Sequence, residues 1–181
     1  MSVRTIERVG TTELVKKSVE GSKPLPRIQD LEDLESFTDI LSGLQYLALY
    51  QIFKEIQIWD SSTWETKNLL APILDFNYDE LQRPFLIFPY FEPLTTEEEA
   101  NKLTFADARD KILSFLESKG INHSKAYDFI RRVRLFCNEW NLNEEDILFN
   151  LNNLGWNDTF GIRILDYGLT EDLVQDYLER Y

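Results

Sequence analysis

Three junctions in the C-terminal half of the chain constrain the fold more than any other feature of the sequence. Each combines a glycine with a following apolar residue: Gly120-Ile121, Gly155-Trp156 and Gly168-Leu169. A left-handed glycine followed by an apolar residue is the Schellman pattern that ends a helix. Each junction also precedes, within three residues, an Asn, Asp or Thr of the kind that begins a helix. Since helices joined by short loops pack as neighbours, residues 101–181 are predicted to form a compact five-helix bundle. Its expected helix starts are Thr104, Asn122 or Ser124, Asn143, Asp158 and Thr170.

The first half of the chain is also predicted to be mostly helical. From Ile28 to Trp59 apolar residues recur at steps of three and four, which indicates one long amphipathic helix that Gly43 can kink or divide. Residues 84–94 differ because they are aromatic and contain three prolines. Prolines remove backbone donors, so this run is expected to be a short extended segment across helices, or at best an edge strand. The predicted fold class is therefore mainly α.

Charge divides the chain into three parts, which we take as its domains: residues 1–27, 28–100 and 101–181. Residues 1–27 carry six basic and three acidic groups and end in the Pro24-Leu-Pro26 linker, which predicts an extended basic N-terminal arm. Two interpretations stay open, a frayed tail or an arm that orders against a partner. Residues 28–100 carry 15 acidic groups against three basic ones, and the whole chain has a net charge of −13.

The sequence gives little support for catalysis. One cysteine, Cys137, and one histidine, His123, exclude a disulfide framework and a Cys/His zinc site. The seven scattered glycines supply no phosphate-binding loop. Cys137 is expected to pack in a helix stripe and His123 to be exposed at a helix start. We therefore predict no catalytic residues, no cofactor and no metal site, although a pair of carboxylates active in acid–base chemistry can be neither located nor excluded.

These observations favour a non-enzymatic acidic protein that binds other proteins, as a subunit or adaptor of a larger assembly that uses the N-terminal arm. The predicted partner-binding residues are Lys16, Lys17, Leu25, Arg27, Phe88, Tyr90, Phe91, Arg131, Arg132, Arg134 and Trp156. Further candidate anchors are Trp59, Trp64 and Trp140.

Two alternatives stay open. The acidic region could imitate the phosphate array of DNA and inhibit a nucleic-acid-binding protein, as an anti-restriction protein would, or the chain could be a small enzyme that uses His123 or paired carboxylates. Direct nucleic-acid binding is not expected, because the helix after Gly168 carries acids that phosphates would repel. No segment is long and apolar enough for a membrane or typical of a secretory signal, so we expect no membrane contact and a cytoplasmic location.

Overall fold

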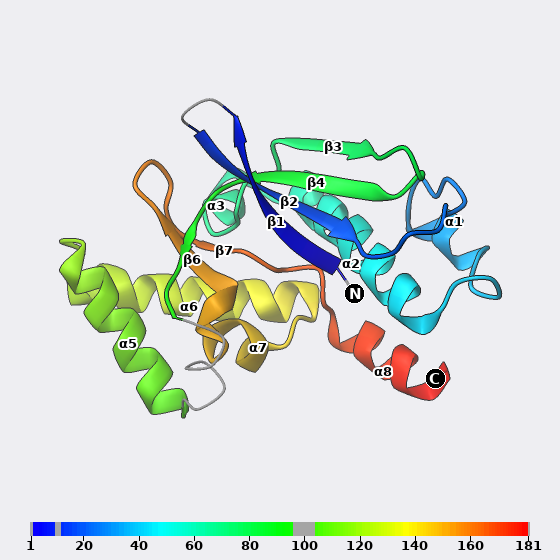
Figure 1. The fold of residues 1–181 in the computed structure, drawn as a ribbon. Coiled ribbons are helices and arrows are strands. Elements are labelled where there is room, and N and C mark those ends of the chain that lie inside the picture. The colour runs from blue at the N-terminus through cyan, green and yellow to red at the C-terminus, as the bar shows by residue number, and fades with distance from the viewer. Residues whose placement is uncertain (1, 10–11, 96–103, 181) are drawn as a thin grey trace. The chain divides into compact units, whose positions relative to one another are not determined.

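The fold combines helices with two antiparallel sheets (Figure 1). The computed structural model describes residues 2–9, 12–95 and 104–180. It is 46% helical and 22% strand, with one sheet of four strands and one of three, so the predicted mainly helical class is wrong. Two compact units form, each from segments that are distant in the sequence. Unit 1 comprises the described residues of Met1–Ser62, Pro72–Tyr90 and Asp172–Tyr181, and unit 2 those of Thr63–Ala71 and Phe91–Glu171.

The N-terminal segment of unit 1 is a β-hairpin, not an extended arm. Strands β1 (Ser2–Val9) and β2 (Thr12–Val19) pair antiparallel along their full length. β2 also pairs with β4 (Pro84–Pro89), so the segment belongs to the sheet of its own unit. The charged residues of this segment suggested that it lies in solvent. One of them, Lys17 on β2, is in fact buried and pairs with Glu55, which is far away in the sequence. Of the predicted domain boundaries, the one between residues 100 and 101 lies outside the described residues, and the one at residue 27 stays a prediction.

The proline-containing segment forms an interior strand. The sheet order is β1-β2-β4-β3, with β3 (Asp75–Tyr78) on the other side of β4. Pro84 and Pro89 are the two end residues of β4, where a missing backbone donor interrupts the ladder least. Position within the strand, more than the number of prolines, therefore decided the pairing of β4, and the expectation of an edge strand is wrong for residues 84–89. In the rest of the predicted segment, β5 (Glu92–Pro93) is an edge strand of the three-stranded sheet.

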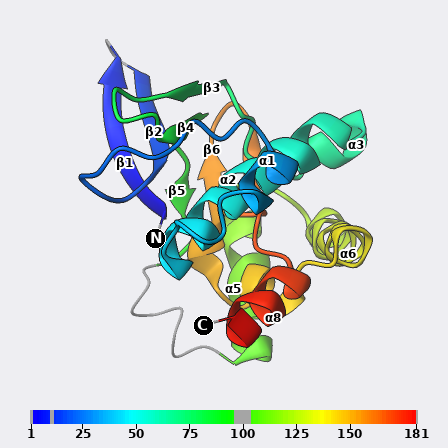
Figure 2. The same cartoon turned by 90° about the vertical axis from the view of Figure 1, so that its right-hand side faces the viewer.

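The predicted helix over residues 28–59 is divided into α1 (Leu31–Glu35) and α2 (Gly43–Ser61). Ser42 begins α2 with a capping box, in which its hydroxyl accepts from the Gln45 backbone N–H and the Gln45 side chain accepts from the Ser42 N–H. α2 packs against β1, β2 and β4, and the strands lie on one side of it (Figure 2). The core of unit 1 includes Ile28, Leu34, Leu49, Ile52, Phe53, Leu86 and Phe88. Helix α8 (Glu171–Arg180) follows the predicted start at Thr170.

Unit 2 contains the helices that local capping chemistry predicted. Thr104, Asn122 and Asn143 are the N-caps of α5 (Phe105–Ser118), α6 (His123–Trp140) and α7 (Glu144–Leu148), as expected. Gly120 ends α5 as predicted, with a φ of 77° and a hydrogen bond from the Ile121 N–H to the Leu116 carbonyl. The other helices among the described residues of unit 2 are short: α3 (Trp64–Lys67) and the 3₁₀ turn η1 (Leu151–Asn153).

The predicted bundle fails at its second and third glycine junctions. Gly168 follows the strand Gly161–Ile164 instead of a helix, and its φ is not positive. Gly155 lies inside β6 (Leu154–Asn157), which pairs with β5 (Glu92–Pro93) and with β7 (Gly161–Ile164). A Cβ atom at Gly155 would lie 2.6 Å from the Phe91 Cβ and 2.9 Å from Leu165 Cδ1. Glycine is therefore required there by close packing, and Asp158 lies in the β6–β7 turn instead of opening a helix. Among the helices of the described ranges, none combines the length and apolar character needed to cross a membrane.

Candidate functional site

A buried ion pair connects β2 to α2 in unit 1. The Lys17 Nζ lies 2.6 Å from Glu55 Oε1, and the two side chains are 1% and 0% exposed. Removing two charges from water costs several kcal/mol per ion, and their mutual attraction only offsets this when the geometry is good. A buried pair is therefore weak evidence for stability, and its presence in the core is a reason to look for another role.

The sheet places Lys17 on the face that α2 covers. Its cross-strand neighbour on β4 is Leu86, which is fully buried, and Val19 two residues along β2 is buried on the same face. Glu55 lies in the middle of the 19-residue helix α2. A charged group is thus enclosed by rigid elements, which suits a site that must hold a ligand atom accurately.

A second candidate lies in unit 2, where two carboxylates interact. Burial and then the negative charge of Asp166 raise the pKa of the Asp146 carboxyl, and a hydrogen bond from the Asn150 side chain opposes the shift. Asp146 belongs to α7, and Asp166 follows β7. Two like charges that are close together in a partly buried place favour a bound cation or a shared proton.

Asn153 connects the segments that carry these two carboxylates. Its side-chain Nδ2 donates to the Asp146 backbone carbonyl over 3.0 Å, and its own carbonyl accepts from the Leu165 N–H over 2.7 Å. The Asn153 side chain is buried, so these bonds are shielded from water. The arrangement fixes Asp146, Asn153 and Asp166 relative to one another within unit 2.

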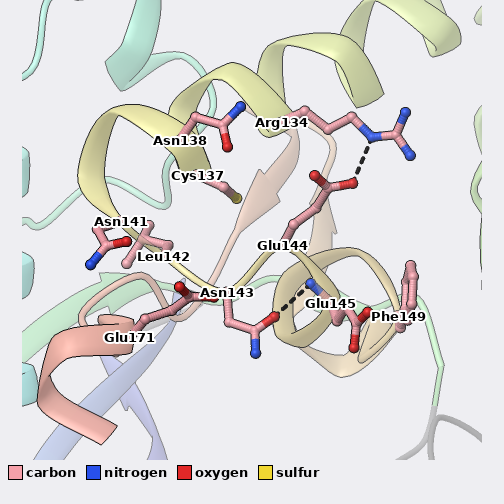
Figure 3. A pocket seen from close by; sticks show the side chains of 10 residues that line it. All are labelled: Arg134, Cys137, Asn138, Asn141, Leu142, Asn143, Glu144, Glu145, Phe149 and Glu171. Atoms are coloured by element: carbon pink, nitrogen blue, oxygen red, sulfur yellow. Dashed lines mark hydrogen bonds and ion pairs between the residues drawn. The ribbon is translucent and has the colours of Figure 1, made fainter. Parts of the chain in front are cut away.

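Unit 2 also has a polar cavity of about 630 Å³ (Figure 3). Its lining comprises Arg134, Cys137, Asn138, Asn141, Leu142, Asn143, Glu144, Glu145, Phe149 and Glu171. The Arg134 Nε lies 2.6 Å from Glu144 Oε1, and the Asn143 Oδ1 accepts from the Glu145 N–H. Burial, followed by the Glu144 charge, raises the pKa of the Cys137 thiol to about 12, so the thiol stays protonated and unreactive at neutral pH.

The structure places the predicted partner-binding residues of unit 1 in different environments. Lys17, Leu25 and Phe88 are buried in the core. Lys16 is half-buried, with its Nζ 4.2 Å from the centroid of the Phe85 ring, and Tyr90 donates its backbone N–H to the Glu13 carbonyl. The exposed Arg27 stacks on Tyr78 at 4.9 Å.

The predicted partner-binding residues of unit 2 are likewise engaged within the unit. Phe91 is buried against Phe160, with ring centroids 6.0 Å apart. Trp156 donates its Nε1–H to Asp158.

The three arginines of α6 each have a different partner. Arg131 pairs with Asp128, Arg132 donates to the Glu65 carbonyl and Arg134 pairs with Glu144. The exposed His123 begins α6, with its Nε2 3.5 Å from Glu117 Oε2.

Sequence reasoning missed Glu55, Asp146, Asn153 and Asp166, and counted Lys17 only as part of an arm. Two signals were present in the sequence. Lys17 lies two residues after the β-branched Val15, and Asp166-Tyr167-Gly168 follows β7, whose Ile162 and Ile164 alternate with Arg163. The carboxylate pair itself is not visible in the sequence, because 20 residues separate its members and 32 acidic residues offer many other pairs.

Comparisons with protein-family models, with curated proteins and with solved structures find no significant match to this chain. Within the described ranges, no group of three or more His, Cys, Asp and Glu side chains could hold a metal ion. Asp146 and Asp166 supply two carboxylates. Mg²⁺ commonly takes one or two carboxylates and completes its shell with water and substrate phosphates, so these two carboxylates would need further ligands to hold that ion.

Proposed function

We propose that the chain binds a phosphate group of a nucleotide through the Lys17–Glu55 pair of unit 1 and, as a separate feature of unit 2, binds Mg²⁺ with the help of Asp146 and Asp166. The observation that carries the proposal is the buried Lys17–Glu55 pair. In protein kinases a strand lysine, paired with a glutamate of a neighbouring helix, contacts the α- and β-phosphates, and this ion pair must be in place for activity. Lys17 on β2 and Glu55 on α2 supply these two groups on these two kinds of element.

Unit 2, by itself, carries residues of the kinds that hold Mg²⁺ and accept a proton in such enzymes. Protein kinases hold Mg²⁺ with the aspartate of an Asp-Phe-Gly segment and with a catalytic-loop asparagine, and a further aspartate accepts the proton of the substrate hydroxyl. Asp166-Tyr167-Gly168 differs from that segment by one hydroxyl group. We assign Asp166 and Asn153 to the metal and Asp146 to the proton. The raised pKa of Asp146 suits a general base, because a base works best when its pKa is near the working pH.

The sequence departs from the protein-kinase pattern in three places. Residues 9–14 contain one glycine, Gly10, where the phosphate-covering loop of protein kinases has three. Glu144-Glu145 precede Asp146, where those enzymes have His-Arg before the aspartate. The metal-binding asparagine of those enzymes lies five residues after the aspartate, whereas Asn153 lies seven residues after Asp146. We therefore expect weak nucleotide binding.

This proposal selects the paired-carboxylate alternative of the sequence analysis over a purely non-enzymatic function. The single buried thiol of Cys137 also fits the cytoplasmic location expected from the sequence, because such compartments keep thiols reduced. The DNA-mimic alternative still rests on the charge of residues 28–100 alone.

The test uses the full chain with ATP and Mg²⁺, and compares the wild type with Asp146→Asn and Asp128→Asn. Asp128 is a matched control, because its carboxylate forms an exposed pair with Arg131. We expect Asp146→Asn to retain the nucleotide binding of unit 1 and to weaken Mg²⁺ binding by unit 2. Asp128→Asn should behave as the wild type. Absence of nucleotide binding by the wild type would refute the assignment of the Lys17–Glu55 pair, and absence of Mg²⁺ binding would refute that of the carboxylates.

A second candidate function is protein binding through the surface around α3 in unit 2. Trp64 is 75% exposed and Leu135 55% exposed, and a cavity of about 170 Å³ is lined by Leu135, Arg132 and Glu65 among others. Large exposed apolar side chains next to an arginine are typical of interface anchors. Affinity purification from the native source with wild type and Trp64→Ala tests this function. The same co-purifying proteins in equal amounts would rule out Trp64 as an anchor.

A further inference from the structure

The polar cavity of unit 2 is separate from both sites proposed above. The Lys17–Glu55 pair belongs to unit 1, and neither Asp146 nor Asp166 lines the cavity. Its volume of about 630 Å³ lies in the range of small-molecule pockets. The lining side chains come from α6, from the loop after α6, from α7 and from Glu171, the last residue of unit 2 (Figure 3).

Backbone hydrogen bonds hold the segments that surround the cavity. The Leu142 N–H donates to the Cys137 carbonyl over 2.9 Å, and the Glu171 N–H donates to the Asn141 carbonyl over 2.9 Å. Leu142 and Thr170 also form an antiparallel bridge. Cys137 and Leu142 are buried and supply apolar surface to the lining. The polar side chains around the cavity therefore project from backbone that is already fixed.

Four polar side chains of the lining have no hydrogen bond or ion pair with another described residue. They are two carboxamides and two carboxylates: Asn138, Asn141, Glu145 and Glu171. The remaining carboxylate, that of Glu144, pairs with Arg134 over 2.6 Å, so these two charges offset each other. The cavity therefore has a net negative charge and several oxygen atoms that can accept hydrogen bonds from a ligand.

This lining fits an organic cation better than a metal ion or an anion. Within the described ranges no group of three or more His, Cys, Asp and Glu side chains could hold a metal, so the three glutamates do not converge on one ion. An anion would be repelled by the two carboxylates that have no counter-charge. A guanidinium group has five N–H donors in a plane and no acceptor, and it forms two parallel hydrogen bonds with a carboxylate. An ammonium group places its three donors at one point and spans less of the cavity.

We propose that this cavity of unit 2 binds the guanidinium group of arginine. Glu145 and Glu171 pair with the cation, and the carboxamide oxygens of Asn138 and Asn141 accept its other N–H groups. The aliphatic part of the ligand lies against Leu142, because long cationic side chains pack their stems on apolar surface. Free arginine and an arginine side chain of a peptide share this group, and the net charge of −13 attracts either one. The inference does not depend on the function proposed above.

The experiment titrates the isotope-labelled full chain with L-arginine and follows its amide resonances by NMR. L-Citrulline is the ligand control, because it has nearly the same shape and no positive charge. N-acetyl-arginine amide presents the guanidinium group as a peptide would. The variants are Glu145→Gln, Glu171→Gln and the double variant, which remove charge and keep the size of the side chain. Glu139→Gln is the matched control, because Glu139 is an exposed residue of α6 that does not line this cavity.

We expect L-arginine to shift the resonances of the lining residues saturably, and L-citrulline to bind about tenfold or more weakly. Each single variant should bind L-arginine about threefold more weakly, as the loss of one partly exposed ion pair implies, and the double variant about tenfold. Glu139→Gln should bind as the wild type does.

The two arginine probes identify the source of the ligand. Tighter binding of N-acetyl-arginine amide than of L-arginine indicates a peptide side chain, the reverse indicates the free amino acid, and either result supports the site. Equal binding of L-citrulline, equal affinity in the double variant, or shifts spread over the whole acidic surface would overturn the inference. The comparison with L-citrulline uses the wild type, so it decides the matter even when a variant does not fold.

Discussion

Replacing Lys17 separates the stability of the buried pair from its function. In Lys17→Met the Glu55 carboxylate stays 0% exposed and loses its counter-charge. Breaking a buried pair in this way costs about 3–5 kcal/mol, which is a large part of the roughly 5–15 kcal/mol that stabilises a typical domain. In Lys17→Met/Glu55→Met both charges are removed and apolar side chains fill the space. Such replacements are neutral or stabilise by about 1–4 kcal/mol.

Lys16→Met is the control for the adjacent position. The Lys16 side chain is 27% exposed, its Nζ is 3.9 Å from Glu7 Oε1, and it lies over the Phe85 ring. Contacts of this kind contribute about 1 kcal/mol or less when exposed to solvent. Urea unfolding followed by tryptophan fluorescence gives the stability of all four proteins, and a fluorescent ATP analogue with Mg²⁺ gives their nucleotide affinity.

We expect stability to fall in the order double variant, wild type, Lys16→Met and Lys17→Met, with the first two close together. Nucleotide binding should persist in the wild type and in Lys16→Met, and be lost in the stable double variant because the phosphate ligand is gone. If the double variant binds nucleotide as the wild type does, Lys17 is not the ligand. If Lys17→Met is as stable as Lys16→Met, the argument from desolvation is wrong.

Three other measurements test the site and the packing of unit 2. Burial and the Asp166 charge raise the pKa of Asp146 above its value in the unfolded chain. This group therefore stabilises the fold at low pH, and its contribution is lost as the pH rises through the raised pKa. In Asp146→Asn the free energy of unfolding should change less with pH over that range. Cys137, with its pKa raised to about 12, should react with a thiol reagent at pH 8 about a thousandfold more slowly in the folded than in the urea-unfolded chain, and equal rates would contradict the buried position. Gly155→Ala should lower the unfolding free energy by about 1–3 kcal/mol, because its Cβ would meet that of Phe91 at 2.6 Å, and an unchanged urea midpoint would show that the neighbours move aside freely.

The sequence predicted those parts of the fold that depend on chemistry between near neighbours in the chain. Thr104 and Asn122 were identifiable as caps because each bonds a backbone N–H three residues away. Gly120 was identifiable because the bonds of its Schellman motif also stay within one turn. The same reasoning failed at Gly155, since glycine before an apolar residue also occurs where a strand needs close approach, and only the positions of Phe91 and Leu165 distinguish the two cases.

The strands and the site were hidden for a related reason. A lysine such as Lys17 is expected to lie at the surface unless a partner for its charge is known. The partner, Glu55, is 38 residues away in the sequence, so sequence reasoning did not identify it. Because charge made residues 1–27 look unable to fold, the alternation that buries Lys17 and Val19 on one face of β2 was not read as a strand. The carboxylate pair depends in the same way on tertiary structure, because Asn153 bonds to the segments of both Asp146 and Asp166.

The Lys17–Glu55 pair is not required to hold β2 against α2. Two apolar side chains would join these elements without desolvating a charge, as Leu49 and Ile52 do elsewhere on the same helix. A pair of apolar side chains provides no positive charge. The Lys17 ammonium is a fixed positive charge in a place from which water is largely excluded, and such a charge attracts an anionic group more strongly there than in water. The rigid strand and helix fix the position of that charge. A phosphate group is a ligand that uses a fixed positive charge in such a place, which is why we propose phosphate binding for the pair and not a role in stability.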